Sequence, residues 1–390
     1  MTGAARLARD RVTFAGYAVL GAWAWFLYGF GALLPLLRAE QGTSRTVVGL
    51  HSLALASGAL VAGAAAVAVV RRLRRRGAVL AGTGCALVGT AVLCAGTVPA
   101  VTLTGVLLMG VGGSTMLNVV NPTLSDHHGA TGAAALAEGN AVAAIVGLVA
   151  PLAVGAGVAV GPGWRPAVLL VIPLLLLVAV LVRRIPADVP ALDGAGPPPR
   201  AERDRLPGAF WLVAVIVVLG VGIEFAMTAW SADLLQQRTG LTAAAASAGV
   251  TAIVGGMAVG RVALGRLALR HSTGRLLVGA FALTVVGWAA GWVSTSPGPA
   301  LAGLALTGVG IGGLYPLGLA LVFAEVPGRR DQAAGVLSLG IGLSSGLAPF
   351  ALGALADASS TRIAFLVVPA LALVALALLG LRTSRAAAPA

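Results

Sequence analysis

Apolar and polar positions along the chain fall into long blocks, not into the short alternation that is typical of half-buried strands. Each apolar block holds about 20 residues or more, the length that an α-helix needs to cross a bilayer core. The joints between blocks carry Gly, Pro, Ser, Thr and Arg, as turns do. The pattern predicts an all-α integral membrane protein with twelve transmembrane helices. The expected spans are 12–37, 46–70, 77–97, 100–121, 132–160, 164–182, 209–235, 243–265, 275–294, 299–323, 332–356 and 362–381.

A stretch of the first half of the chain recurs in the second half. Its glycines and a later Ala-Pro pair reappear at a constant offset of 198 residues, across two apolar segments and the polar loop between them. A constant offset over such a length predicts an internal duplication. The matched positions are Gly105, Gly110, Gly112, Ala150-Pro151 and Gly155 in the first copy, and Gly303, Gly308, Gly310, Ala348-Pro349 and Gly353 in the second.

One long hydrophilic segment, 183–208, separates the two copies. It contains Pro197-Pro198-Pro199 and charges of both signs, which is typical of a linker. We therefore expect a six-helix bundle over 1–182, a cytoplasmic linker, and a second six-helix bundle over 209–390. An even number of spans before the linker gives both bundles the same orientation, so the repeat is expected to be parallel.

Charge refines the membrane topology. Only 10% of the 390 residues are charged, 58% are hydrophobic, and the mean hydropathy is +0.97. The net charge of +13 does not indicate nucleic-acid binding, because the arginines lie in short loops between apolar spans. If the N-terminus is cytoplasmic, 20 arginines lie in inner segments and five in outer loops, which predicts that both termini are inside. All 26 basic residues are Arg, and with the abundant Ala and Gly this suggests a GC-rich bacterial genome. The expected location is therefore the bacterial plasma (inner) membrane.

Several chemistries find no support in the sequence. Cys85 and Cys94 are about 13 Å apart along one expected helix, so they cannot form a disulfide. There is no metal-ligand spacing and no phosphate-binding Gly-Lys loop, so neither a metal, a cofactor nor ATP-driven transport is expected. The first apolar run is too long for a signal peptide and is interpreted as a retained span.

The duplicated six-plus-six pattern with a central linker resembles the major facilitator superfamily over nearly the whole chain. Near the end of the eighth span the sequence is similar to that family's G-x-x-x-D-R-x-G-R-R loop signature, except that Leu269 stands where an acid is usual. The first half keeps only the arginines, as RRLRRRG. The resemblance implies a gating loop that contains Gly260, Arg261, Gly265, Arg266 and Arg270.

Two further stretches carry resemblances within that family. Gly147-Leu-Val-Ala-Pro151, followed by Gly155, is similar to the antiporter signature of the fifth helix, with Ala150 in place of a glycine. The seventh span, GVGIEFAMTAW, and the pair Asn121-Pro122 look like the fucose-permease-like branch, in which an acid in the seventh helix is common.

Two acids inside expected spans are the main candidates for chemistry, since a charge inside a bilayer is costly and is usually functional. Glu224 lies near the middle of the seventh span and shares a helical face with Gly220, Thr228 and Ser231, which predicts that it faces an interior. It is a proton site, a direct substrate contact, or a structural hydrogen-bonding group. Glu138, in the fifth span, is a second relay acid or a side chain that snorkels to the inner interface.

Polar and aromatic side chains within spans are candidates for contacting a solute. Interhelical hydrogen bonds or packing would also explain them, and Arg261 would anchor a helix end unless the substrate is an anion. Trp164, Trp230 and Trp292 are expected in the interfacial belts. The substrate-binding candidates are Trp25, Tyr28, His51, Ser114, Asn118, Asn121, Asn140, Thr228, Tyr315 and Ser338.

The leading hypothesis is a secondary active transporter, a symporter or antiporter, that carries a small organic solute by alternating access with proton coupling. An uncoupled facilitator or a drug or metabolite exporter of the same fold is the alternative. A membrane-embedded transferase is disfavoured because no cluster of nucleophile, metal ligands or paired acids is present, so we do not expect an enzyme. The expected partners are the solute, protons and lipid, with no nucleic acid and a monomeric chain.

Overall fold

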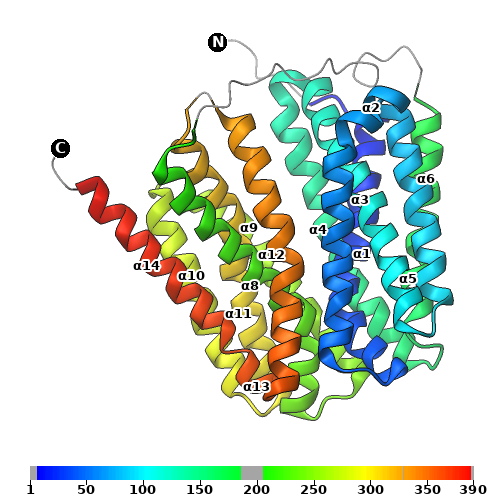
Figure 1. Ribbon diagram of the computed structural model, residues 1–390, viewed down its shortest axis with the longest axis vertical. Helices are drawn as coiled ribbons and strands as arrows, with labels where there is room; N and C mark the ends of the chain where they lie inside the picture. The colour runs from blue at the N-terminus through cyan, green and yellow to red at the C-terminus, as the bar shows by residue number, and fades with distance from the viewer. Residues whose placement is uncertain (1–6, 186–204, 328, 388–390) are drawn as a thin grey trace. The chain divides into compact units, whose positions relative to one another are not determined.

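The computed structural model describes residues 7–185, 205–327 and 329–387. These residues form α-helices and one 3-10 turn, and no strand occurs among them (Figure 1). The described residues contain eleven helical spans that are long and apolar enough to cross a membrane. Two of these spans, Arg165–Arg183 and Thr361–Arg382, each consist of a short helix followed by a longer one. The all-α prediction is therefore confirmed, whereas most of the predicted linker lies outside the described residues.

Contacts divide the chain into two compact units. Unit 1 comprises Met1–Phe30 and Ala54–Arg200, and unit 2 comprises Gly31–Leu53 and Ala201–Ala390. Two helices, α1 (Arg11–Gln41) and α2 (Arg45–Ala95), contribute to both units. The other helices of unit 1 are α3 (Pro99–His128), the 3-10 turn η1 (Gly129–Thr131), α4 (Gly132–Ala159), α5 (Arg165–Leu169) and α6 (Val171–Arg183).

Unit 2 is built around α8, which contacts four of the other long helices of its unit. Among these contacts, α12 and α14 pack against α8, while α11 packs closely against both α9 and α10. The helices are α8 (Gly208–Thr239), α9 (Ala243–Leu267), α10 (Thr273–Val293), α11 (Pro297–Ala324), α12 (Arg330–Ala358), α13 (Thr361–Ala364) and α14 (Val367–Ala387).

Helix α2 covers two predicted spans, 46–70 and 77–97, in 51 residues. At about 1.5 Å per residue it is more than twice as long as a bilayer core is thick. Arg74, within the run Arg71–Arg76, interrupts it with a non-helical backbone at φ 59° and ψ 171°. The two predicted spans 46–70 and 77–97 therefore correspond to the parts of α2 before and after the interruption at Arg74.

The last span of each half is broken near its start, which the sequence analysis did not predict. Short helices α5 and α13 precede α6 and α14. Pro173 and Pro369 explain the breaks, because proline has no N–H to donate to the carbonyl four residues earlier, that of Leu169 or Phe365.

The internal duplication is repeated in the helix contacts. In unit 1, a Cβ added at Gly58 would meet the carbonyl oxygen of Leu107, and one at Gly110 would meet that of Leu55. In unit 2, Gly256 stands in the same relation to Ala305, and Gly308 to Ile253. All four positions shift by 198 residues (58 to 256, 107 to 305, 110 to 308, 55 to 253), so the duplicated glycines serve the same close backbone approach.

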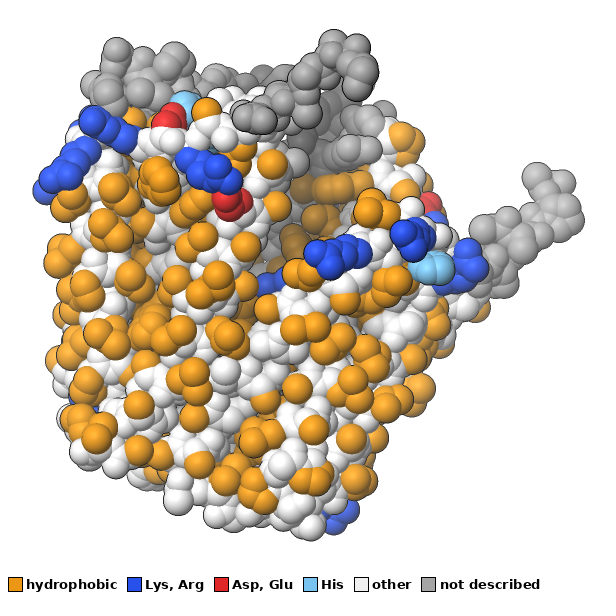
Figure 2. All heavy atoms as spheres, turned by 180° about the vertical axis from the view of Figure 1, so that it is seen from behind, with side chains coloured by type: hydrophobic (Ala, Val, Ile, Leu, Met, Phe, Trp, Pro, Cys, Tyr) orange, Lys and Arg blue, Asp and Glu red, His pale blue; other side chains and the backbone are white. Residues whose placement is uncertain are grey.

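Large apolar side chains are exposed along the helices, as a lipid-facing surface requires. Figure 2 shows apolar side chains over most of the face in view, with most charged groups toward the upper part. Among the exposed apolar side chains, Ile145 is 67% exposed and Leu373 is 61% exposed. Trp230 departs from its predicted belt position: it is fully buried and donates from Nε1 to the carbonyl of Pro349 at 2.8 Å.

Candidate functional site

Glu224 lies near the middle of the 32-residue α8 and faces Arg261 of α9 within unit 2. Its Oε1 is 3.7 Å from Nη2 of Arg261, and its side chain is 15% exposed, against 41% for Arg261. Tyr315 of α11 also interacts electrostatically with Glu224. The structure thus brings together three of the predicted residues, one from each of three helices.

The local sequence explains how these helices come close to the acid. Gly220, one turn before Glu224, contacts Leu314 of α11, where an added Cβ would lie 3.2 Å from the leucine Cβ. Thr228, one turn after it, donates its hydroxyl back to the Glu224 carbonyl at 2.9 Å. Gly220 has no side chain, and the Thr228 hydroxyl is hydrogen-bonded within its own helix. The Glu224 carboxylate is therefore the polar group of this turn that faces a partner helix.

The ion pair extends one expectation. Arg261, which was expected to anchor a helix end, also pairs with Glu224. Two opposite charges about 4 Å apart attract by about 4 kcal/mol at an effective dielectric of 20, which offsets part of the cost of removing each from water. The two charges therefore stabilise each other inside unit 2.

The predicted gating residues are placed partly in a helix. Gly260, Arg261, Gly265 and Arg266 lie in α9, which ends at Leu267, and Arg270 follows in a turn. A Cβ at Gly260 would meet the Val309 carbonyl of α11, so this glycine serves helix packing. Leu269, at the position of the missing acid, is 85% exposed.

In unit 1 the arginine-rich turn obtains an acid from another helix. Arg75 is 6% exposed and pairs with Asp126 near the end of α3 at 2.7 Å. The pair ties the arginine-rich run of α2 to the end of α3. Because the Asp126 side chain is 55% exposed, solvent screens the pair, and its contribution to stability is at most about 1 kcal/mol.

Glu138 has the contacts of an interfacial ion pair. Its carboxylate accepts from Arg9 at 2.8 Å and from the hydroxyl of Tyr17 at 2.7 Å, all within unit 1. The bond to Glu138 raises the pKa of the exposed Arg9 guanidinium, which lies before α1. These contacts hold the start of α1 against α4 and supply the partner that a snorkelling acid requires.

The remaining candidates differ in burial and in their local contacts. His51 is fully buried, with Nδ1 2.9 Å from the carbonyl of Val48, and Ser114 is also buried. Trp25 donates from Nε1 to the carbonyl of Ala167 at 2.9 Å, and Tyr28 packs its ring against Gly147. The exposed candidates are Asn118, Asn121, Asn140, Tyr315 and Ser338.

Asn140 and Ser338, which the 198-residue offset relates, have the same local bond. Each donates its side chain to the backbone carbonyl one turn earlier, Leu136 or Ala334, at 2.8 Å. Because helical residues commonly make such bonds, they do not distinguish a solute contact from ordinary helix structure.

A buried charge cluster in unit 2 was missed by the sequence analysis. Asp233 of α8 is 1% exposed and accepts hydrogen bonds from Arg38 at 3.0 Å and Arg45 at 2.9 Å, both from the segment Gly31–Leu53. Gln237 and Thr361 donate to the same carboxylate at 2.7 and 3.0 Å. The available signal was a second acid, Asp233, within the same predicted span as Glu224.

The same segment is bound at a second point. Asp357, at the end of α12, accepts from the backbone N–H groups of Arg45 and Thr46 at 3.0 and 2.7 Å, and from the Thr46 hydroxyl at 2.7 Å. An acid placed on free N–H groups at a helix start is a stabilising cap. Asp357 thus caps α2 from a distant part of the sequence.

Comparison with known proteins places this arrangement in a family. The family model described as Major Facilitator Superfamily matches residues 14–262 and 210–390. No curated protein sequence matches the chain.

Solved structures share the fold at low sequence identity. A bacterial homologue of the human lysosomal transporter Spinster, in an inward-facing and occupied conformation, has a TM-score of 0.75 at 14% identity, with 98% of each chain covered. A variant of the nucleoside transporter NupG has a TM-score of 0.76 at 12% identity, covering 96% of this chain and 98% of that chain. The fucose:proton symporter FucP of E. coli, also a variant, has 0.62 at 16% identity, covering 95% and 98%.

Proposed function

The chain belongs to the major facilitator superfamily, and from this premise we propose that it is a proton-coupled secondary active transporter of a small organic solute. The observation that carries the proposal is the Glu224–Arg261 pair, an acid in the middle of a membrane helix facing a cation on a neighbouring helix. Transport proceeds by alternating access, in which the solute site opens to one side of the membrane at a time.

The pair provides a means of coupling. In one state the Glu224 carboxylate is ionised and its charge is balanced by Arg261. When a proton binds to the carboxylate, the attraction between the two groups is lost and Arg261 is released to a solute or to water. Because protonation and release are linked, a proton gradient can bias the helices α8 and α9 between two arrangements.

The proposed solute is small and polar. Solved proteins of similar fold include a fucose:proton symporter, a nucleoside transporter and a xylose transporter. Tyr315, which interacts electrostatically with Glu224, adds a phenol that can hydrogen-bond or stack against a ring. We therefore choose L-fucose, D-xylose and nucleosides as the first compounds for a ligand-induced thermal-shift screen.

The experiment is uptake into sealed proteoliposomes of a solute that the screen identifies. In Glu224→Gln we expect proton-driven uphill uptake to be lost while counterflow exchange survives, since exchange needs solute binding and rocking but no net proton movement. Asp126→Asn, which neutralises an exposed acid, is the matched control and should retain both activities. Full uphill uptake by Glu224→Gln would exclude it as the coupling group.

The alternative functions give different results in the same system. An uncoupled facilitator would move solute downhill and be indifferent to a protonophore. An exporter would accumulate solute in inside-out vesicles. A transferase would consume its substrate in detergent, where no sealed compartment exists, whereas transport requires one.

The membrane setting proposed for this activity is the bacterial plasma membrane, with both termini in the cytoplasm. The excess of arginine in the predicted inner segments supports this orientation. We also retain the division into two six-helix bundles, 1–182 and 209–390, joined by the linker 183–208.

A further inference from the structure

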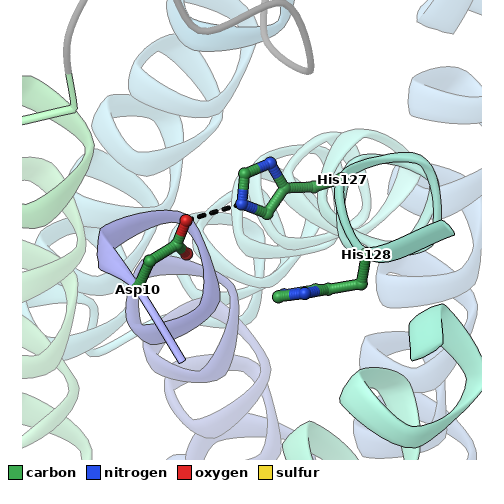
Figure 3. A group of neighbouring side chains, drawn as sticks. All are labelled: Asp10, His127 and His128. Atoms are coloured by element: carbon green, nitrogen blue, oxygen red, sulfur yellow. Dashed lines mark hydrogen bonds and ion pairs between the residues drawn. The ribbon is translucent and has the colours of Figure 1, made fainter. Parts of the chain in front are cut away.

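Three potential metal ligands that are distant in the sequence meet in unit 1. Asp10 precedes α1, whereas His127 and His128 are the last two residues of α3. Their ligand atoms all lie within 4.8 Å of one another, and Nε2 of His127 is 2.6 Å from Oδ2 of Asp10. Figure 3 shows the three side chains converging from the ends of the two helices.

Thr13 fixes the orientation of two of these groups. It is fully buried, and its backbone N–H and hydroxyl donate to Oδ1 of Asp10 at 3.0 and 2.8 Å, which leaves Oδ2 facing His127. The same hydroxyl oxygen is 2.9 Å from Nε2 of His128 and accepts from it, because the hydroxyl proton is already given to Asp10. Buried groups that hold ligands in place in this way are typical of metal sites.

The neighbouring arginines are engaged elsewhere, so they do not neutralise Asp10. Arg9 donates to Glu138 at 2.8 Å, and Arg11 donates to the carbonyl of Arg184 at 3.2 Å. The carboxylate is therefore available as an anionic ligand.

The donor set defines the class of ion. Two imidazoles and one carboxylate match the ligands of Zn²⁺ and related transition ions, whereas Mg²⁺ and Ca²⁺ prefer all-oxygen sites. A tetrahedral ion with ligands at about 2.0–2.2 Å keeps its donors about 3.4 Å apart. The present donors, all within 4.8 Å of one another, would have to move closer together to reach that spacing.

We propose that Asp10, His127 and His128 form a binding site for a divalent transition-metal ion of the Zn²⁺ class, which ties the start of α1 to the end of α3. The three ligands leave at least one coordination position for water. The sequence alone did not indicate the site, because Asp10 and His127 are 117 residues apart and no local metal motif exists. The proposal is independent of the transport function.

The test is a metal titration of the full-length chain, purified in detergent without a polyhistidine tag and treated with a chelator. We expect one Zn²⁺ per chain, a rise of the unfolding temperature with Zn²⁺, and a visible absorption band with Co²⁺ that Zn²⁺ removes. His127→Ala and His128→Ala should each weaken binding at least about tenfold, and the double variant should abolish it.

Two controls separate ligation from folding. His271→Ala removes an exposed histidine of unit 2 and should bind Zn²⁺ as the wild type does. Asp10→Asn retains the capping of α1, so its unfolding temperature without metal should be unchanged while its Zn²⁺ affinity falls. Absence of stoichiometric Zn²⁺ binding by the wild type, or undiminished binding by the His127/His128 double variant, would overturn the proposal.

Discussion

At the scale of single residues, two acids of α8 are paired with arginines, but to different degrees. Asp233 is 1% exposed and shared between Arg38 and Arg45, whereas Glu224 has one cation at the longer distance of 3.7 Å. A tightly satisfied buried acid is costly to disturb, and a loosely paired one is easier to protonate or to exchange. This difference supports a structural role for Asp233 and a coupling role for Glu224.

Asp233→Asn is expected to destabilise the protein strongly. The asparagine keeps the shape but removes the counter-charge that Arg38 and Arg45 share, and leaves Arg45 with the longer pair to Asp357 at 3.9 Å. Breaking a buried pair in this way costs about 3–5 kcal/mol. Thermal unfolding in detergent measures the effect. Asp126→Asn, which breaks an exposed pair, should cost at most about 1 kcal/mol. Equal unfolding temperatures for the two variants would contradict the assignment of Asp233 as a buried structural centre.

At the scale of helices, glycine decides how closely neighbours approach. Gly308 of α11 lies against the Ile253 carbonyl of α9, and Gly110 of α3 against the Leu55 carbonyl of α2. Without an aqueous hydrophobic effect between helices, such close packing provides much of the association energy in a membrane. The duplicated glycines therefore set the geometry of the helix pairs that carry Arg261 and Tyr315 in unit 2.

Gly308→Ala should destabilise unit 2, because its Cβ would collide with backbone that cannot rotate away. The expected cost is about 1–3 kcal/mol, as for overpacked cores. Gly279→Ala in α10 is the matched control, since an added Cβ there meets nothing within 4 Å. It should be neutral or stabilise the helix by up to about 1 kcal/mol. Unfolding temperatures of the two variants that shift in the same direction would contradict this packing account.

At the scale of the whole molecule, the fold was accessible from sequence and the contacts between helices were not. Apolar runs of about 20 residues predicted the helices, because the thickness of the bilayer sets the length of a span. The constant offset of 198 residues predicted the duplication, because two copies of one ancestral segment keep their spacing. Helical periodicity places Glu224 on a face but does not say that this face meets Arg261.

The two polar clusters that were missed share one cause. Asp233 and Arg45 are 188 residues apart, and Asp10 and His127 are 117 apart. Each cluster joins the end of one helix to a residue of a distant one, so no local spacing reveals it. The proline breaks before α6 and α14 differ in this respect, because Pro173 and Pro369 are local signals that could have predicted them.

The central claim is that solute movement is coupled to proton movement through Glu224. The most direct measurement is the internal pH of proteoliposomes, reported by a trapped fluorescent dye, after an inward gradient of an identified solute is imposed without a pH gradient. The account predicts a solute-dependent pH change in the wild type and in Asp126→Asn, and none in Glu224→Gln. Solute uptake by the wild type with no accompanying pH change would contradict it.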